Sequence, residues 1–151
     1  MSEINGCNAN PLLIRSSFPP GPPSDPFYYI IPDTDLAIHF APLGLIPGRN
    51  ETLVTRALRE AFYTSLDYRV TAKMPGHGYQ LQEREFLLSI SHSAGMHDLT
   101  WGMWTIILTA MTGYVHAYVG YDFMYEIEYI PEGQLRGHMI GAGFAMTRGR
   151  G

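Results

Sequence analysis

Two histidines, His92 and His97, flank a loop in a pattern that could do chemistry. Asp98 follows the second, and two imidazoles with a carboxylate are ligands that Zn²⁺ accepts. Their spacing is not that of a recognised metal pair on a helix, so the sequence favours solvated loop histidines. Ser91 precedes His92, but adjacent strand residues point to opposite faces, which argues against a nucleophile with its base. We predict no catalytic residue, cofactor or metal site, and metal binding at His92 and His97 is the alternative.

A third histidine, His116, is expected on the polar face of a helix together with Thr109 and Thr112. These side chains could line a small polar pocket between that helix and a sheet, which makes them the candidate ligand-binding residues. The competing interpretation is a half-buried His116 bonded to a backbone carbonyl, since buried polar groups usually find partners. The sequence favours this second interpretation.

Two carboxylates, Glu126 and Glu128, alternate along a predicted strand and therefore share one face. Paired carboxylates can divide acid and base work between them. The same alternation is typical of the solvated face of a strand, and this is the interpretation that the sequence favours.

The stretch that must position these residues is Leu99 to Tyr121, which contains no Asp, Glu, Lys or Arg. Its apolar residues recur at the three- and four-residue spacing of an amphipathic helix, and the candidate core is Trp101, Trp104, Leu108, Met111 and Val115. A polar stripe runs along the opposite face, and no Lys or Arg flanks the stretch as a membrane anchor. We therefore predict a buried helix in a soluble protein rather than a membrane span.

The rest of the chain alternates between strand and helix patterns. An Asn50 cap predicts one helix over 50–66 and the central stretch predicts another over 99–119. Strands are predicted at 27–31, 36–40, 123–129 and 134–146, with a hairpin that pairs 68–74 with 79–91. The expected fold class is α+β, with two helices on one face of a mainly antiparallel sheet, of which a ferredoxin-like split β-α-β arrangement is one member.

Glycines 137, 141 and 143 fall in the last predicted strand. Glycine inside a strand often marks a bulge or a close approach of another group. We interpret these positions as a bulge, or as places where large aromatic side chains of a neighbouring strand cross the sheet.

The composition of the 151 residues indicates one domain, predicted at 27–147, after a disordered Pro-rich leader at 1–26 and before a flexible tail at 148–151. Charged residues make up 16%, against about 25% in typical domains, and the net charge is −4. No basic patch for nucleic acid is present. The single cysteine, Cys7, excludes an internal disulfide. Without a signal-peptide pattern the default expectation is cytoplasmic, or secreted if the N-terminus is incomplete.

The succession IPDTDLAIHF, an amphipathic helix, FLLSIS, LTWGMWTIIL and a glycine-containing last strand resembles a group of small α+β proteins of filamentous fungi. The matching residues are Thr34 to Phe40, Leu99 to Leu108 and Gly133 to Gly143. These motifs are structural, and the group has no established activity. The resemblance therefore implies a fold and assigns no functional residue.

Two functions follow from these observations. The absence of a catalytic constellation and the many Tyr, Phe and Met residues favour a non-enzymatic interaction or structural domain, with another copy or another protein as partner. The alternative is a small-molecule-binding protein or an enzyme with a pocket beside the 99–119 helix. A flat apolar patch would favour the first, and a closed pocket lined by His116 and tyrosines would favour the second.

Overall fold

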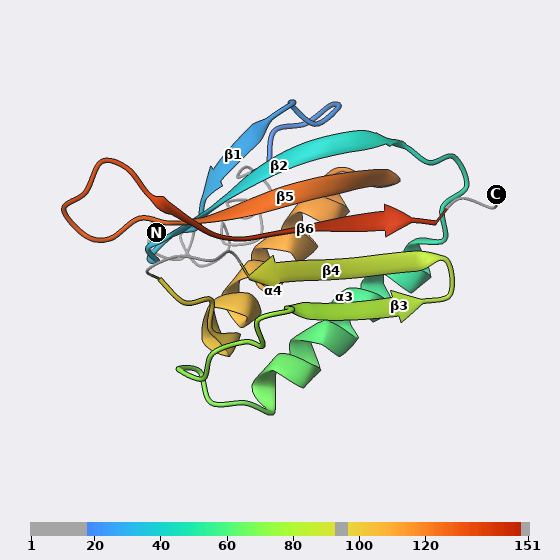
Figure 1. Cartoon of the computed structure of the whole chain (residues 1–151). Helices are drawn as coiled ribbons and strands as arrows, with labels where there is room; N and C mark the ends of the chain where they lie inside the picture. Colours follow the sequence, from blue (N-terminus) through green and yellow to red (C-terminus); the bar gives the residue numbers. More distant parts are fainter. Residues whose placement is uncertain (1–17, 93–96, 149–151) are drawn as a thin grey trace, which may run out of the picture.

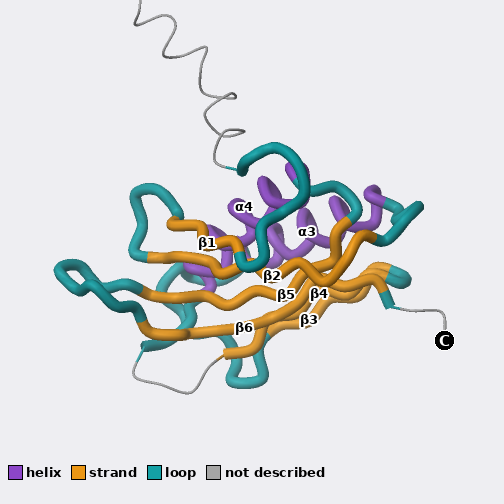
Figure 2. Tube along the Cα trace, turned by 90° about the horizontal axis from the view of Figure 1, so that it is seen from above, coloured by secondary structure: helices purple, strands orange, loops and turns teal. Residues whose placement is uncertain are grey.

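The computed structural model describes residues 18–92 and 97–148, which form one sheet and two helices. In chain order the elements are β1 (Phe27–Ile30), β2 (Leu36–Leu45), α3 (Glu51–Leu66), β3 (Tyr79–Glu83), β4 (Phe86–His92), α4 (Trp101–Ala117), β5 (Tyr121–Tyr129) and β6 (His138–Thr147). The six strands are antiparallel throughout, in the order β1-β2-β5-β6-β4-β3. Both helices lie on the same side of the sheet (Figures 1 and 2). The predicted α+β fold class is confirmed.

The connection through α4 is a split β-α-β unit. This helix joins β4 to β5, and β6 lies between those two strands and is antiparallel to both. The strands on either side of the helix therefore run parallel without touching. This feature is shared with ferredoxin-like folds. A ferredoxin-like assignment for the whole sheet, which carries two further strands, stays a prediction.

The helix starts lie at polar caps. The Asn50 side chain accepts a hydrogen bond from the Thr52 N–H at 3.0 Å, and the Thr100 hydroxyl accepts one from the Met103 N–H at 3.2 Å. Each cap satisfies a backbone N–H that the first helical turn leaves without an intrahelical partner. Asn50 is the cap that the sequence predicts. Within the described ranges, neither helix combines the length and apolar character needed to cross a membrane.

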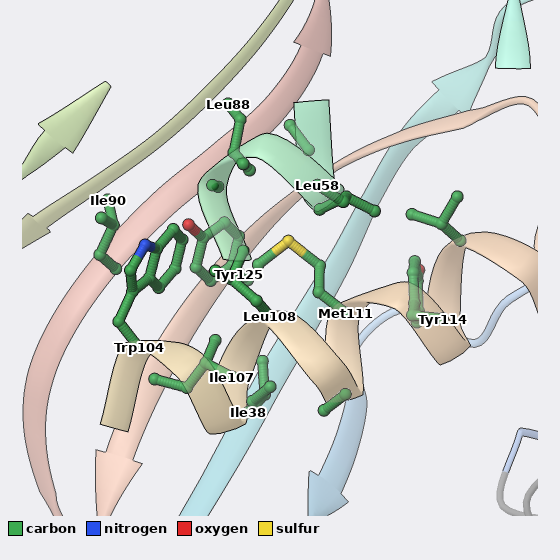
Figure 3. Packing of buried hydrophobic residues seen from close by; sticks show 14 of the residues in the cluster. Ile38, Leu58, Leu88, Ile90, Trp104, Ile107, Leu108, Met111, Tyr114 and Tyr125 are labelled. Carbon is green, nitrogen blue, oxygen red and sulfur yellow. The ribbon is translucent and has the colours of Figure 1, made fainter. Parts of the chain in front are cut away.

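The core lies between the helices and the sheet face that they cover, which we call the inner face. All five predicted core residues of the central helix are buried: Trp101, Trp104, Leu108, Met111 and Val115. Figure 3 shows three of them, Trp104, Leu108 and Met111, in the core. They pack on inner-face residues of the central strands, such as Ile38 and Tyr125. Near the far end of α4, Tyr114 stacks on Phe40 with ring centroids 4.0 Å apart. Hydrophobic burial on this one face is the main stabilising contribution to the fold.

Gly143 is required by an aromatic side chain that crosses it. Tyr125 on β5 passes over Gly143 on β6, and its hydroxyl donates to the Ser89 carbonyl on β4. A Cβ atom at Gly143 would lie 2.7 Å from the Tyr125 hydroxyl oxygen and would overlap the Ser89 backbone. The interpretation of this glycine as an aromatic crossing point is confirmed. Burial raises the pKa of Tyr125 well above its ordinary value, so the tyrosine remains a neutral donor.

The predicted strand at 68–74 is wrong. The hairpin instead pairs β3 with β4 through a tight turn at Arg84, and within 68–74 only Lys73 forms a described β-bridge, with Thr100. Carbonyls of Val70 and Ala72 accept hydrogen bonds from the Gly102 and Trp101 N–H groups. The segment therefore lies alongside the start of α4. Its alternating pattern reflects contacts with that helix rather than with a strand.

Part of the predicted leader packs on the domain. Phe18 is only 6% exposed, and its ring contacts the rings of Tyr29 and Tyr118 and fits beside Gly113 on α4. The Tyr118 hydroxyl donates to the Pro19 carbonyl at 2.9 Å. Phe18 and Pro19, which the sequence placed in the leader, therefore contact the folded domain. The rest of the predicted leader, with Cys7, and tail residues 149–151 lie outside the described residues.

Candidate binding face

The sheet face away from the helices, the outer face, carries two rows of side chains that cross neighbouring strands. Strand register places Ala41, Met124, Phe144 and Ser89 opposite one another in the first row, and His39, Glu126, Ala142 and Ser91 in the second. Each row runs through β2, β5, β6 and β4. Alternation along these strands puts the rows on the face that neither helix covers.

These rows line a groove of about 460 Å³, which we call the outer groove. Its first row is mostly apolar, and Met124 in the middle of it is 50% exposed. The second row adds the Glu126 carboxylate and the His39 imidazole. The groove residues, all of which the structure describes, include no Lys or Arg. The outer groove is thus an apolar surface with one side of acidic character.

Glu128 anchors a hydrogen-bond network at the rim of this face. Its Oε1 accepts from the Tyr28 hydroxyl and contacts His39 Nε2, both at 3.0 Å, and its Oε2 accepts from the Gly137 N–H at 3.0 Å. Partial burial alone would raise the pKa of Glu128, but the hydrogen bonds from His39, Tyr28 and Gly137 outweigh it and lower that pKa. Burial and the bond to Glu128 raise the pKa of Tyr28. The network fixes the orientation of the His39 ring, which faces the groove.

Glu126 is in the opposite situation two residues earlier on β5. It is exposed and stands directly across from His39 and Ala142. Among the described residues it has no hydrogen bond or ion pair. The sequence placed the two carboxylates on one face, and they do share it, but Glu128 has structural partners whereas the described part of the chain provides none for Glu126. Sequence reasoning missed His39 and Tyr28, whose only signal was an outward position on an alternating strand.

The predicted ligand residues His116, Thr109 and Thr112 do share one depression, of about 260 Å³, which Phe62 and Tyr63 of α3 help to line. It lies between the two helices and not between helix and sheet, because the apolar stripe of α4 occupies the sheet side. The Thr109 and Thr112 hydroxyls donate to carbonyls one turn earlier, at 3.1 and 2.8 Å. His116 is exposed, so its interpretation as a half-buried histidine is wrong.

The alternative metal residues have separate partners. His92 Nε2 accepts a hydrogen bond from the Leu99 N–H at 3.0 Å, which ties the end of β4 to the start of the α4 segment. The His97 ring packs against the rings of Tyr129 and His138, at 4.9 and 4.7 Å between centroids. In the ranges that the structure describes, no three His, Cys, Asp or Glu residues are grouped to hold a metal ion.

A buried ion pair lies at the other end of the sheet, beside a depression of about 520 Å³. The Arg49 guanidinium binds both oxygens of Glu51 at 2.7 and 2.9 Å and contacts Asp122 at 3.1 Å. Asp122 also accepts from the Thr147 N–H at 2.8 Å and from its hydroxyl at 3.1 Å. These charges satisfy one another and join the α3 start to β5 and β6. We assign them a structural role, so the outer groove is the stronger candidate.

Comparisons with protein families, with curated proteins and with solved structures found no match for this chain. The resemblance to the fungal group stays a prediction. The functional argument therefore rests on the geometry of the outer face.

Proposed function

We propose that this chain is a non-enzymatic interaction domain that binds a partner protein through the outer face of its sheet. The observation that carries the proposal is the half-exposed Met124 at the centre of the sheet, flanked by Ala41 and Phe144 on the neighbouring strands. Apolar side chains in this central position gain most from being covered, because association removes their surface from water.

The surroundings of Met124 favour a protein interface. Interface centres are rich in Met and aromatic residues and poor in charge, and a polar rim surrounds them. On the outer face the centre is Met124 with Phe144, and the polar side chains of Tyr28, His39 and Gln80 stand on the strands to either side. The arrangement therefore has a centre and a rim of the expected kinds.

The favoured occupant is a different protein rather than a second copy. In a symmetric dimer the same surface patch is used on both subunits. Pairing two outer faces would bring together four carboxylates from Glu126 and Glu128 without a Lys or Arg from either groove. A partner with basic residues avoids this repulsion and matches the charge of the face.

Small-molecule binding beside the 99–119 helix has less support. The depression at His116 measures about 260 Å³, and its threonine hydroxyls already donate to the backbone of their own helix. Ligand pockets typically span about 300–1,000 Å³ and present free polar groups to the ligand.

The proposal is tested by photo-cross-linking from the full chain in an extract of its source cells. The cross-linking residue replaces Met124 on the outer face or, as the matched control, Thr55 on the exposed side of helix α3. We expect a partner that cross-links from position 124 and not from position 55. Binding of that purified partner should then weaken at least about tenfold with Met124→Asp and stay unchanged with Thr55→Asp.

Two results would overturn the proposal. One is cross-linking only from position 55, which would place the interface on the helices. The other is binding of the purified partner that Met124→Asp does not affect while that variant keeps the melting temperature of the parent chain.

A further inference from the structure

The outer groove contains one carboxylate, Glu126, that has no partner among the described residues. Glu126 projects from β5 between His39 and Ala142, and the described residues provide it with no counter-ion. Glu128, on the same strand and face, has three hydrogen-bond partners. The contrast shows that this sheet can satisfy a carboxylate from within, and that it leaves Glu126 available.

The surface next to Glu126 is hydrocarbon. Met124 lies on the same strand face and Phe144 stands directly across from it on β6, and both line the groove with Glu126. A ligand that follows the groove therefore meets methionine and phenylalanine side chains first and a carboxylate beside them. Lys and Arg side chains have the matching form, because a long apolar stem carries the cation at its end.

Anionic groups are disfavoured at the same place. Glu126 and Glu128 both contribute negative charge to this face, and among the described groove residues no Lys or Arg offsets it. A neutral apolar side chain could fill the groove but would cover Glu126 without giving it a partner, which costs free energy. A basic side chain gains from both features.

We propose that the outer groove takes a basic side chain of the partner protein, with its stem along Met124 and Phe144 and its cation on the Glu126 carboxylate. This inference rests on the proposed function and names the partner chemistry that the face recognises. Interface positions that combine an apolar stem with a paired charge are frequent binding hot spots, arginine above all. The bidentate geometry of a guanidinium on a carboxylate makes arginine the better occupant.

The test uses two blocked pentapeptides, each with a central residue between leucines, on the isotope-labelled full chain in NMR titrations. The central residue is arginine in one peptide and citrulline, its neutral isostere, in the other. We expect the arginine peptide to bind about three- to fivefold more tightly, the scale of one partly exposed ion pair. With Glu126→Gln the two peptides should bind with equal affinity. Glu132→Gln, which removes an exposed carboxylate from the β5–β6 loop, should preserve the preference for arginine.

Equal affinities for the two peptides, a ratio that Glu126→Gln leaves unchanged, or no shift of outer-groove resonances with either peptide would overturn this inference. The proposed function has its own readout. One outcome is a partner that cross-links through Met124 and yet binds Glu126→Gln as tightly as it binds the parent chain. That result would support the docking face and contradict only the inference about a basic side chain. If no partner cross-links in a Met124-dependent way, both the proposed function and this inference are contradicted.

Discussion

The two faces of the same sheet differ in how completely the fold uses them. On β5 the inner-face residues Phe123, Tyr125 and Ile127 are 0%, 1% and 0% exposed, whereas Met124 between them is 50% exposed. The strand alternation is identical on both sides, but only the inner side is covered by α3 and α4 (Figure 2). The stability of the domain is therefore concentrated on one face. Residues on the other face are free to serve binding.

A matched pair of truncations gives the strongest test of this difference between the two faces. Leu108→Ala on the inner side should lower the free energy of unfolding by about 2–5 kcal/mol, because it leaves a cavity between α4 and the sheet. Met124→Ala on the outer side should change it by less than about 0.5 kcal/mol, as surface substitutions do. Urea unfolding of both variants measures the difference. Similar losses from the two variants would mean that the outer face is also part of the folding core.

A second truncation extends the inner core to the segment before β1. Phe18→Ala should cost about 3 kcal/mol, since the ring is buried against aromatic side chains of β1 and α4. Replacing its exposed neighbour Pro20 by alanine is the control and should have little effect. Thermal unfolding of the two variants decides the point. An unchanged melting temperature for Phe18→Ala would show that this ring does not contribute to the folding core.

Adjacent residues on β6 sharpen the comparison further. Gly143→Ala should destabilise by about 1–3 kcal/mol, because the added methyl group meets the Tyr125 hydroxyl and the Ser89 backbone. Ala142→Ser, one residue earlier and on the outer face, should be close to neutral. Denaturant titrations of the pair provide the measurement. An unchanged free energy of unfolding for Gly143→Ala would contradict the close passage of Tyr125 over this position.

The smallest expected effect is pH-dependent and belongs to the rim of the outer face. Because the pKa of Glu128 is lowered in the folded chain, its ionised form adds stability above the ordinary carboxyl value of 4.5. Solvent screens the group, so the contribution is at most about 1 kcal/mol. The stability difference between the parent chain and Glu128→Gln should shrink as the pH falls below about 4.5 and through the lowered pKa. A difference that stays constant from neutral to acidic pH would contradict the assigned network.

The sequence predicted features that depend on local periodicity and failed where distant residues decide. Trp104 and Leu108 were identifiable as core because the helical spacing alone puts them on one stripe. The alternating pattern at 68–74 resembles a strand, but the partner is the start of α4, which local pattern does not reveal. His39 and Glu128 are separated by 89 positions, and only the register of β2 against β5 brings them together.

The most direct test of the central claim is the footprint of the purified partner on the isotope-labelled chain. Backbone amide shifts report which face a bound protein covers. We expect the largest changes around Met124, Glu126 and Phe144 in the outer groove, and little change at Thr55 and His116 on the exposed side of the helices. A footprint centred on α3 and α4, with the outer groove unchanged, would contradict the assignment of the outer face as the docking surface.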